Sequence, residues 1–81
     1  MEKDGTFMEY NYQKMTISLR KKLVLSQMEM ADKLGVSFAS INRWETGKNE
    51  PTIKAKRKLI SLCKKNGIPL YEKEEVSLET K

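Results

Sequence analysis

The stretch QMEMADKLGVSFASINRWETG, residues 27–47, decides the fold of this 81-residue chain. It contains two short segments whose apolar residues recur at helical spacing, and only Gly35-Val36-Ser37 separates them. A connection this short cannot turn two helices into antiparallel packing, so it forces them to cross at roughly 90–120°. We therefore predict two short helices that meet at a steep angle.

The residues around this turn meet the demands of such a crossing. A small residue, Ala31, stands where the two helices must touch, and Ile41 supplies a branched apolar anchor from the second one. Gly35 can take the positive φ that the turn requires. Leu34 and Val36 are expected to close the turn from the inside.

Capping signals extend the helical prediction in both directions. A first helix covers about residues 12–23, with Met15, Leu19 and Leu23 along one face. Ser26, with Glu29 three residues later, forms the capping-box pattern that begins the next helix.

The last two helices are placed in the same way. One begins after Ser37 and is expected to end at Gly47, and the other begins at Thr52 and ends at residues 66–67. Trp44 is predicted to be a core residue of the third helix. The inner face of the fourth is predicted to consist of Ile53, Leu59, Ile60, Leu62 and Cys63.

Composition excludes several classes of protein. The chain has no His and one cysteine, Cys63, so it can form neither an internal disulfide nor a zinc site of the usual kinds. We expect Cys63 to be a buried, inert thiol. No apolar run reaches the ~18 residues of a membrane span. We expect no membrane association, no metal, no cofactor and no enzymatic activity, and a cytoplasmic location.

Charge is unevenly distributed along the chain. The net charge is +5, but residues 13–67 contain 13 basic and 4 acidic residues, whereas both ends are mildly acidic. A strongly basic body favours nucleic acid as the partner. The predicted organisation is a flexible segment over 1–11, a DNA-binding domain over 12–67 and a tail over 68–81.

The identity and spacing of a set of residues between Leu25 and Pro51 resemble the phage-repressor type of helix-turn-helix domain, the Xre/Cro/C1 family. The matching residues are Leu25-Ser26-Gln27, Ala31, Leu34-Gly35-Val36-Ser37, Ile41, Trp44-Glu45, Gly47-Lys48 and Pro51. The resemblance implies an all-α, compact four- to five-helix, lambda-repressor-like fold. It also implies a nucleoid-associated transcriptional regulator, expected to be a repressor, that binds specific double-stranded DNA as a homodimer, at least on DNA.

The resemblance also implies a partly buried structural ion pair between Arg20 and Glu45. Two positions differ from the family pattern, so the family's turn geometry and base contacts cannot be transferred directly to this sequence. Val24 stands where the family usually has Gly or another turn-tolerant residue, and Phe38 and Ala39 replace the amides that begin the recognition helix in the best-known repressors.

The third helix is expected to enter the major groove with the face opposite its core residues. The predicted base contacts are Phe38, Ala39, Asn42 and Arg43. The predicted phosphate contacts, several of them implied by the resemblance, are Gln27, Ser37, Ser40, Thr46, Lys48, Asn49, Thr52 and Lys54.

Other interpretations of these residues stay open. Phe38 could pack on its own fold, and Arg43 and the basic run over 54–58 could be solvated surface. Met28 could belong to a partner patch. The alternative function is an antitoxin-like or adaptor protein whose 68–81 tail binds a partner protein, and a further one is the DNA-targeting part of a larger restriction or mobile-element system.

Overall fold

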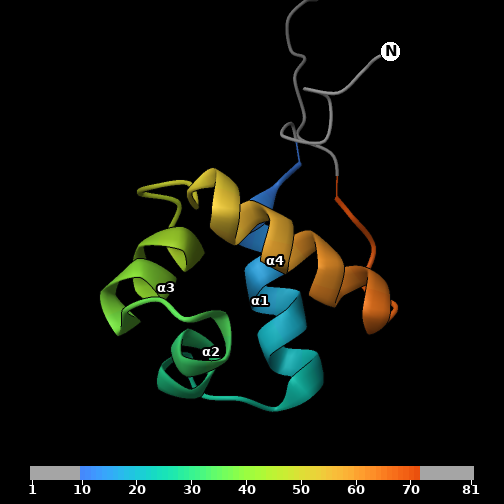
Figure 1. Ribbon diagram of the computed structural model, residues 1–81, viewed down its shortest axis with the longest axis horizontal. Coiled ribbons are helices and arrows are strands. Elements are labelled where there is room, and N and C mark those ends of the chain that lie inside the picture. The colour runs from blue at the N-terminus through green and yellow to red at the C-terminus, as the bar shows by residue number, and fades with distance from the viewer. Residues whose placement is uncertain (1–9, 72–81) are drawn as a thin grey trace, which may run out of the picture.

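The computed structural model describes residues 10–71 and folds them into four helices (Figure 1). Their bounds are α1 Tyr12–Leu23, α2 Gln27–Leu34, α3 Phe38–Glu45 and α4 Ile53–Lys65. The predicted all-α fold class is confirmed.

Each helix begins where the sequence supplies a cap. Asn11, Ser26, Ser37 and Thr52 accept a hydrogen bond from a backbone N–H in the first turn of α1, α2, α3 and α4. At α2 the reciprocal bond from the Ser26 N–H to the Glu29 carboxylate completes the capping box, at 2.9 Å. Local chemistry therefore sets where the helices start.

The end of α3 differs from the prediction. The helix stops at Glu45, two residues before Gly47. The Thr46 hydroxyl donates to the carbonyls of Asn42 and Arg43, and Gly47 turns the chain away with a φ of +79°. Gly47 is thus the turning residue after the helix and not its last residue.

The core lies where the four helices meet. Its buried members are Tyr12, Met15, Leu19, Met30, Ala31, Leu34, Ile41, Trp44, Ala55, Leu59, Cys63 and Ile68. Trp44 and Cys63 are core residues, as predicted. The prediction for Ile53 was wrong: its side chain is 55% exposed, and Ala55 is buried in α4 instead. The two residues are about 200° apart around a helix, so they cannot share a face.

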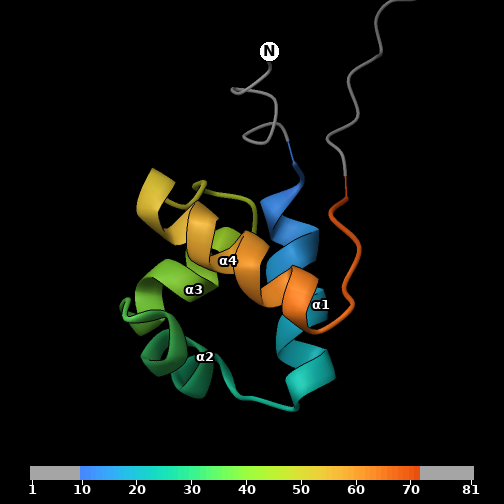
Figure 2. The same ribbon diagram turned by 45° about the vertical axis from the view of Figure 1, so that its right-hand side comes forward.

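The crossing of α2 and α3 sits against α1, which packs on α3 and α4 (Figure 2). Ala31 and Ile41 are buried at this crossing, and Gly35 ends α2 with a φ of +70°. The connection between α1 and α2 contains Val24, whose φ is +56° and whose side chain is 85% exposed. This β-branched residue therefore occupies the left-handed region that favours glycine.

The packed unit extends beyond residue 67, where the predicted tail begins. Ile68 is buried, Leu70 and Tyr71 pack against the core, and the Asn11 N–H donates to the Tyr71 carbonyl at 2.7 Å. The two ends of the described chain accordingly lie side by side in Figures 1 and 2. The predictions for residues 1–9 and 72–81 fall outside the described residues. Among residues 10–71, no helix is long and apolar enough to cross a membrane.

Candidate nucleic-acid interface

The exposed face of α3 carries the four residues predicted to contact bases. Phe38, Ala39, Asn42 and Arg43 are all exposed, because the opposite side of the helix is buried in the core. Phe38 is 51% exposed, so much of its ring remains open to solvent. An α-helix is about 10–12 Å wide with its side chains and the major groove is about 12 Å wide, so this face can enter the groove.

An ion pair joins the C-terminal end of α3 to α1. The Arg20 guanidinium donates to both carboxylate oxygens of Glu45, from Nε to Oε2 at 2.6 Å and from Nη2 to Oε1 at 3.0 Å. The side chains are 23% and 8% exposed. Bidentate pairs of this kind are among the stronger hydrogen-bonded contacts in proteins.

The environment of Glu45 favours its ionised form. Burial alone would raise the pKa of this carboxyl, but hydrogen bonds from Arg20 and Gln27 and the charges of Arg20 and Lys21 lower it more. The pKa of Glu45 therefore lies below its ordinary value. The hydrogen bond to Glu45 raises the pKa of Arg20, against the effect of burial.

Gln27 lies between this ion pair and the exposed face of α3. Its Nε2 donates to Glu45 Oε1 at 3.0 Å, and its Oε1 accepts from Asn42 Nδ2 at 3.4 Å. The predicted phosphate-binding amide and one predicted base-reading amide are thus hydrogen-bonded to each other.

The hydroxyl groups predicted to contact phosphate have partners within the fold. Ser37 and Thr52 serve as helix caps, and the oxygens of Ser37 and Ser40 lie 3.0 Å apart. Thr46 bonds to two carbonyls at the end of α3. Ser37, Ser40 and Thr52 thus lie at helix N-terminal ends, where backbone N–H groups can also bind an anion, whereas Thr46 lies at the C-terminal end of α3, where carbonyls are exposed.

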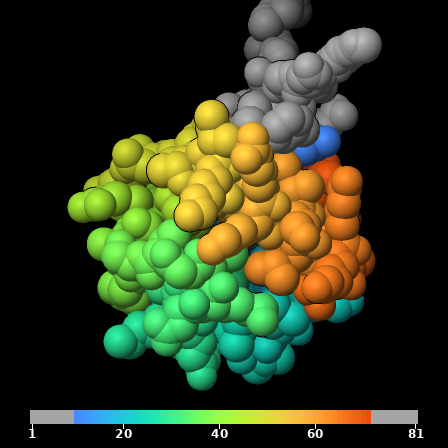
Figure 3. Space-filling view, in the orientation of Figure 1, coloured from blue at the N-terminus to red at the C-terminus, as the bar shows by residue number. Residues whose placement is uncertain are grey.

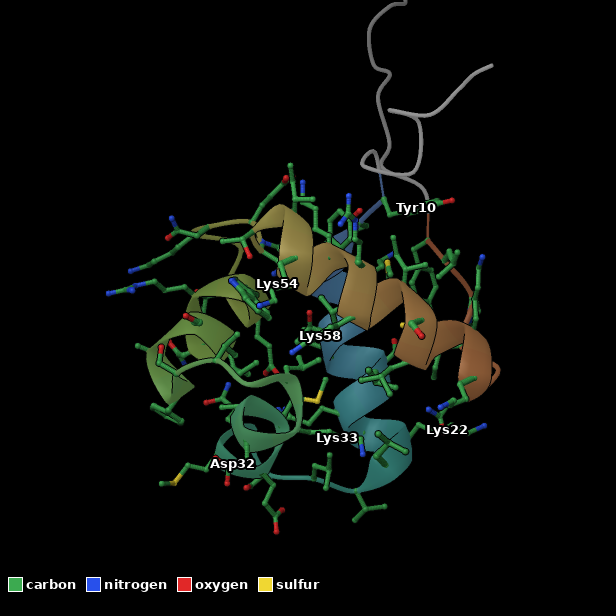
Figure 4. All side chains as sticks on the ribbon, in the orientation of Figure 1. Tyr10, Lys22, Asp32, Lys33, Lys54 and Lys58 are labelled. Carbon is green, nitrogen blue, oxygen red and sulfur yellow. The ribbon has the colours of Figure 1, made fainter. Side chains whose placement is uncertain are left out.

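The predicted lysine contacts follow α3 in the chain. Lys48 and Asn49 are exposed in the connection to α4, and Lys54 is exposed in its first turn. Figure 3 shows α2, α3 and the start of α4 forming a continuous surface, and Figure 4 labels Lys54 and Lys58 on the neighbouring part of α4. Within the basic run, Lys56 pairs with Glu50 at 3.0 Å.

Two residues that support this surface were not found by sequence reasoning. Gln13 on α1 donates to the Glu45 carbonyl at 2.9 Å, and Lys58 on α4 donates to the Leu34 carbonyl at 3.2 Å. Each therefore satisfies a carbonyl at the C-terminal end of α3 or α2. No local pattern marks them, because their partners are distant in sequence.

A family model described as helix-turn-helix matches residues 17–72, more than half of the chain. The chain belongs to the Cro/C1-type helix-turn-helix family. Comparison with curated proteins and with solved structures finds no match.

This family consists of DNA-binding transcription regulators, which are typically not enzymes. The match covers all of α2, α3 and α4 and most of α1. The crossing of α2 and α3 is therefore the helix-turn-helix of the family, with α3 as its second helix. Within residues 10–71, no group of three or more His, Cys, Asp or Glu is placed to hold a metal ion.

Proposed function

We propose that this helix-turn-helix protein is a sequence-specific regulator, acting as a repressor, that reads the major groove of duplex DNA with α3. The observation that carries the proposal is the joint exposure of Phe38, Ala39, Asn42 and Arg43 on one face of α3. Arg43 suits a bidentate contact with guanine and Asn42 one with adenine. Phe38 and Ala39 offer apolar contact to a thymine methyl group.

Phosphate contacts from residues before and after α3 in the chain hold the helix in register. Gln27 begins α2, which precedes α3 in the chain, and the exposed residues Lys48, Asn49 and Lys54 follow α3. Such contacts contribute affinity and orientation without reading sequence. The remaining proposed contacts are the hydroxyls of Ser37, Ser40 and Thr52, at the N-terminal ends of α3 and α4, and the hydroxyl of Thr46, directly after α3.

A single module of this size reads only half of a two-fold site, so we propose that the chain binds DNA as a homodimer. Its site is then an inverted repeat whose half-sites lie about one helical turn of DNA apart. Occupation of a promoter by this dimer blocks transcription. The protein acts where that DNA lies, in the cytoplasm at the nucleoid.

Selection from a random-sequence duplex library tests this function. We expect an enriched inverted repeat, and binding to it that weakens about 10³-fold or more between about 50 and 200 mM salt. Enrichment of no common sequence, with equal binding to all duplexes, would refute sequence-specific recognition.

A further inference from the structure

The hydrogen bonds between α1, α2 and α3 form one network that runs from the partly buried ion pair to the exposed face of α3. Arg20 donates to Glu45, Gln27 donates to Glu45 at 3.0 Å, and Asn42 donates to Gln27 at 3.4 Å. At one end the Glu45 side chain is 8% exposed, and at the other Asn42 is exposed. A residue withdrawn from solvent is thereby linked to an amide on the DNA-facing side.

The carboxylate of Glu45 determines which group donates in each of these hydrogen bonds. An ionised carboxylate can only accept, so the amide facing it must present its NH₂ group. Gln27 consequently turns its Oε1 toward Asn42, and Asn42 donates to it from Nδ2. A reversed Gln27 would place its Oε1 against the Glu45 carboxylate, and a reversed Asn42 would place its Oδ1 against Gln27 Oε1, so either reversal would bring two acceptors together. Without a partner, the amide of Asn42 would have two nearly equivalent orientations. The bond to Gln27 holds it in one of them.

The two amides keep the groups that recognition needs. Asn42 Nδ2 donates one hydrogen to Gln27 and keeps the other for a base. Asn42 Oδ1 takes no part in these hydrogen bonds. That free pair matches the N7 acceptor and N6 donor of adenine. Gln27 Nε2 likewise gives one hydrogen to Glu45 and retains the second for a phosphate oxygen.

We infer that Glu45 and Gln27 are positioning residues that hold the Asn42 amide in the orientation that selects adenine. The inference rests on the proposed reading of DNA by α3. It assigns to the Glu45 carboxylate a role in specificity beyond its ion pair with Arg20. Pre-set orientation favours the correct base because the amide does not have to be reordered when it binds.

The test uses the full chain and the duplex that it selects from a random library. Competition titrations with single-base-pair variants of that duplex measure discrimination at each position. Asn42→Ala identifies the base pair that Asn42 reads. Glu45→Gln removes the acceptor-only group and Gln27→Met removes the link, and each should reduce discrimination at that base pair by about 3-fold or more. Discrimination at the other base pairs should stay as in the wild type.

Arg20→Lys is the matched control. It weakens the ion pair but retains the carboxylate of Glu45 and its bond to Gln27, so discrimination at the Asn42 base pair should persist. The side-chain NH₂ resonances of Asn42, measured by NMR without DNA, should shift in Glu45→Gln and Gln27→Met but remain in place in Arg20→Lys. Gln27→Met keeps the ion pair, so it tests the inference even if Glu45→Gln does not fold.

The outcomes separate this inference from the proposed function. If Asn42→Ala changes base preference at no position, the reading of DNA by Asn42 fails, and the inference fails with it. If Asn42→Ala abolishes preference at one base pair whereas Gln27→Met and folded Glu45→Gln keep it in full, the proposed function stands and the positioning role is overturned.

Discussion

Arg20 and Glu45 join α1 to the last turn of α3 through two hydrogen bonds, at 2.6 and 3.0 Å. The same guanidinium donates from Nη1 to the Leu25 carbonyl at 3.0 Å, in the connection that leads to α2. One side chain therefore contacts the C-terminal turn of α3 and the segment that precedes α2. This contact holds the proposed reading helix at a defined angle to the rest of the fold.

Replacement of Glu45 by Gln should lower the free energy of unfolding at pH 7 by about 2–3 kcal/mol. The variant keeps the size of the side chain but leaves Arg20, whose side chain is only 23% exposed, without a charged partner. Urea unfolding measures the change. A loss no larger than that of an exposed control such as Asp32→Asn would show that the pair contributes little.

This difference in stability should depend on pH. The pKa of Glu45 is lowered in the folded state, so its stabilising effect is complete above the unfolded value of about 4.3. The effect is lost as the pH falls through the lower, folded pKa. Unfolding free energies of wild type and Glu45→Gln should therefore converge as the pH is lowered from 7 to about 3. A difference that stays constant over this range would contradict the account.

Val24→Gly should stabilise the protein by about 0.5–1 kcal/mol. Relief of the left-handed conformation contributes about 1–2 kcal/mol, and the greater freedom of glycine in the unfolded chain offsets part of it. Thermal unfolding measures the gain, and Val24→Ala, which keeps a Cβ, is the control with a smaller gain. Destabilisation by Val24→Gly would be inconsistent with a φ of +56° at this position.

The exposure of Ile53 leads to a comparison within α4. Leu59→Ala should cost about 2–5 kcal/mol because Leu59 is fully buried. Ile53→Ala should change stability by about 0.5 kcal/mol or less, since its side chain is 55% exposed. Urea unfolding of both variants provides the measurement. Equal losses would mean that Ile53 belongs to the core after all.

Cys63 should resist alkylation in the folded protein. Its side chain is fully buried, and burial raises the pKa of the thiol to about 11, so little thiolate forms near neutral pH. Mass spectrometry after iodoacetamide treatment should find native protein unmodified and urea-unfolded protein labelled, with Cys63→Ala as the blank. Rapid labelling under native conditions would be incompatible with this burial.

Much of the fold could be predicted because it depends on residues close together in the chain. Ser26, directly before α2, and Glu29, in its first turn, cap the start of this helix. Gly35 ends α2 in the left-handed conformation. The spacing of Ile41 and Trp44 likewise identified the buried side of α3. These are interactions within a few residues, which local sequence encodes directly.

The rest depends on how the helices are packed. An apolar residue at the start of α4 was assigned to the core, but the position of the helix turns Ile53 outward. The bonds of Gln13 and Lys58 to helix ends, and the link from Gln27 to Glu45, join residues 18 to 32 positions apart. Only the assembled fold brings such groups within hydrogen-bonding distance.

The base preferences of Arg43→Ala, compared with those of the wild type and Lys48→Ala, test the central claim most directly. Both residues are exposed and basic, but only Arg43 lies on the proposed reading face of α3. In selection from a random-sequence duplex library, Arg43→Ala should lose preference at one base pair of each half-site. Lys48→Ala should weaken binding to all duplexes about equally and keep the preferred sequence. An unchanged preferred sequence and affinity for Arg43→Ala would contradict the reading of DNA by this face of α3.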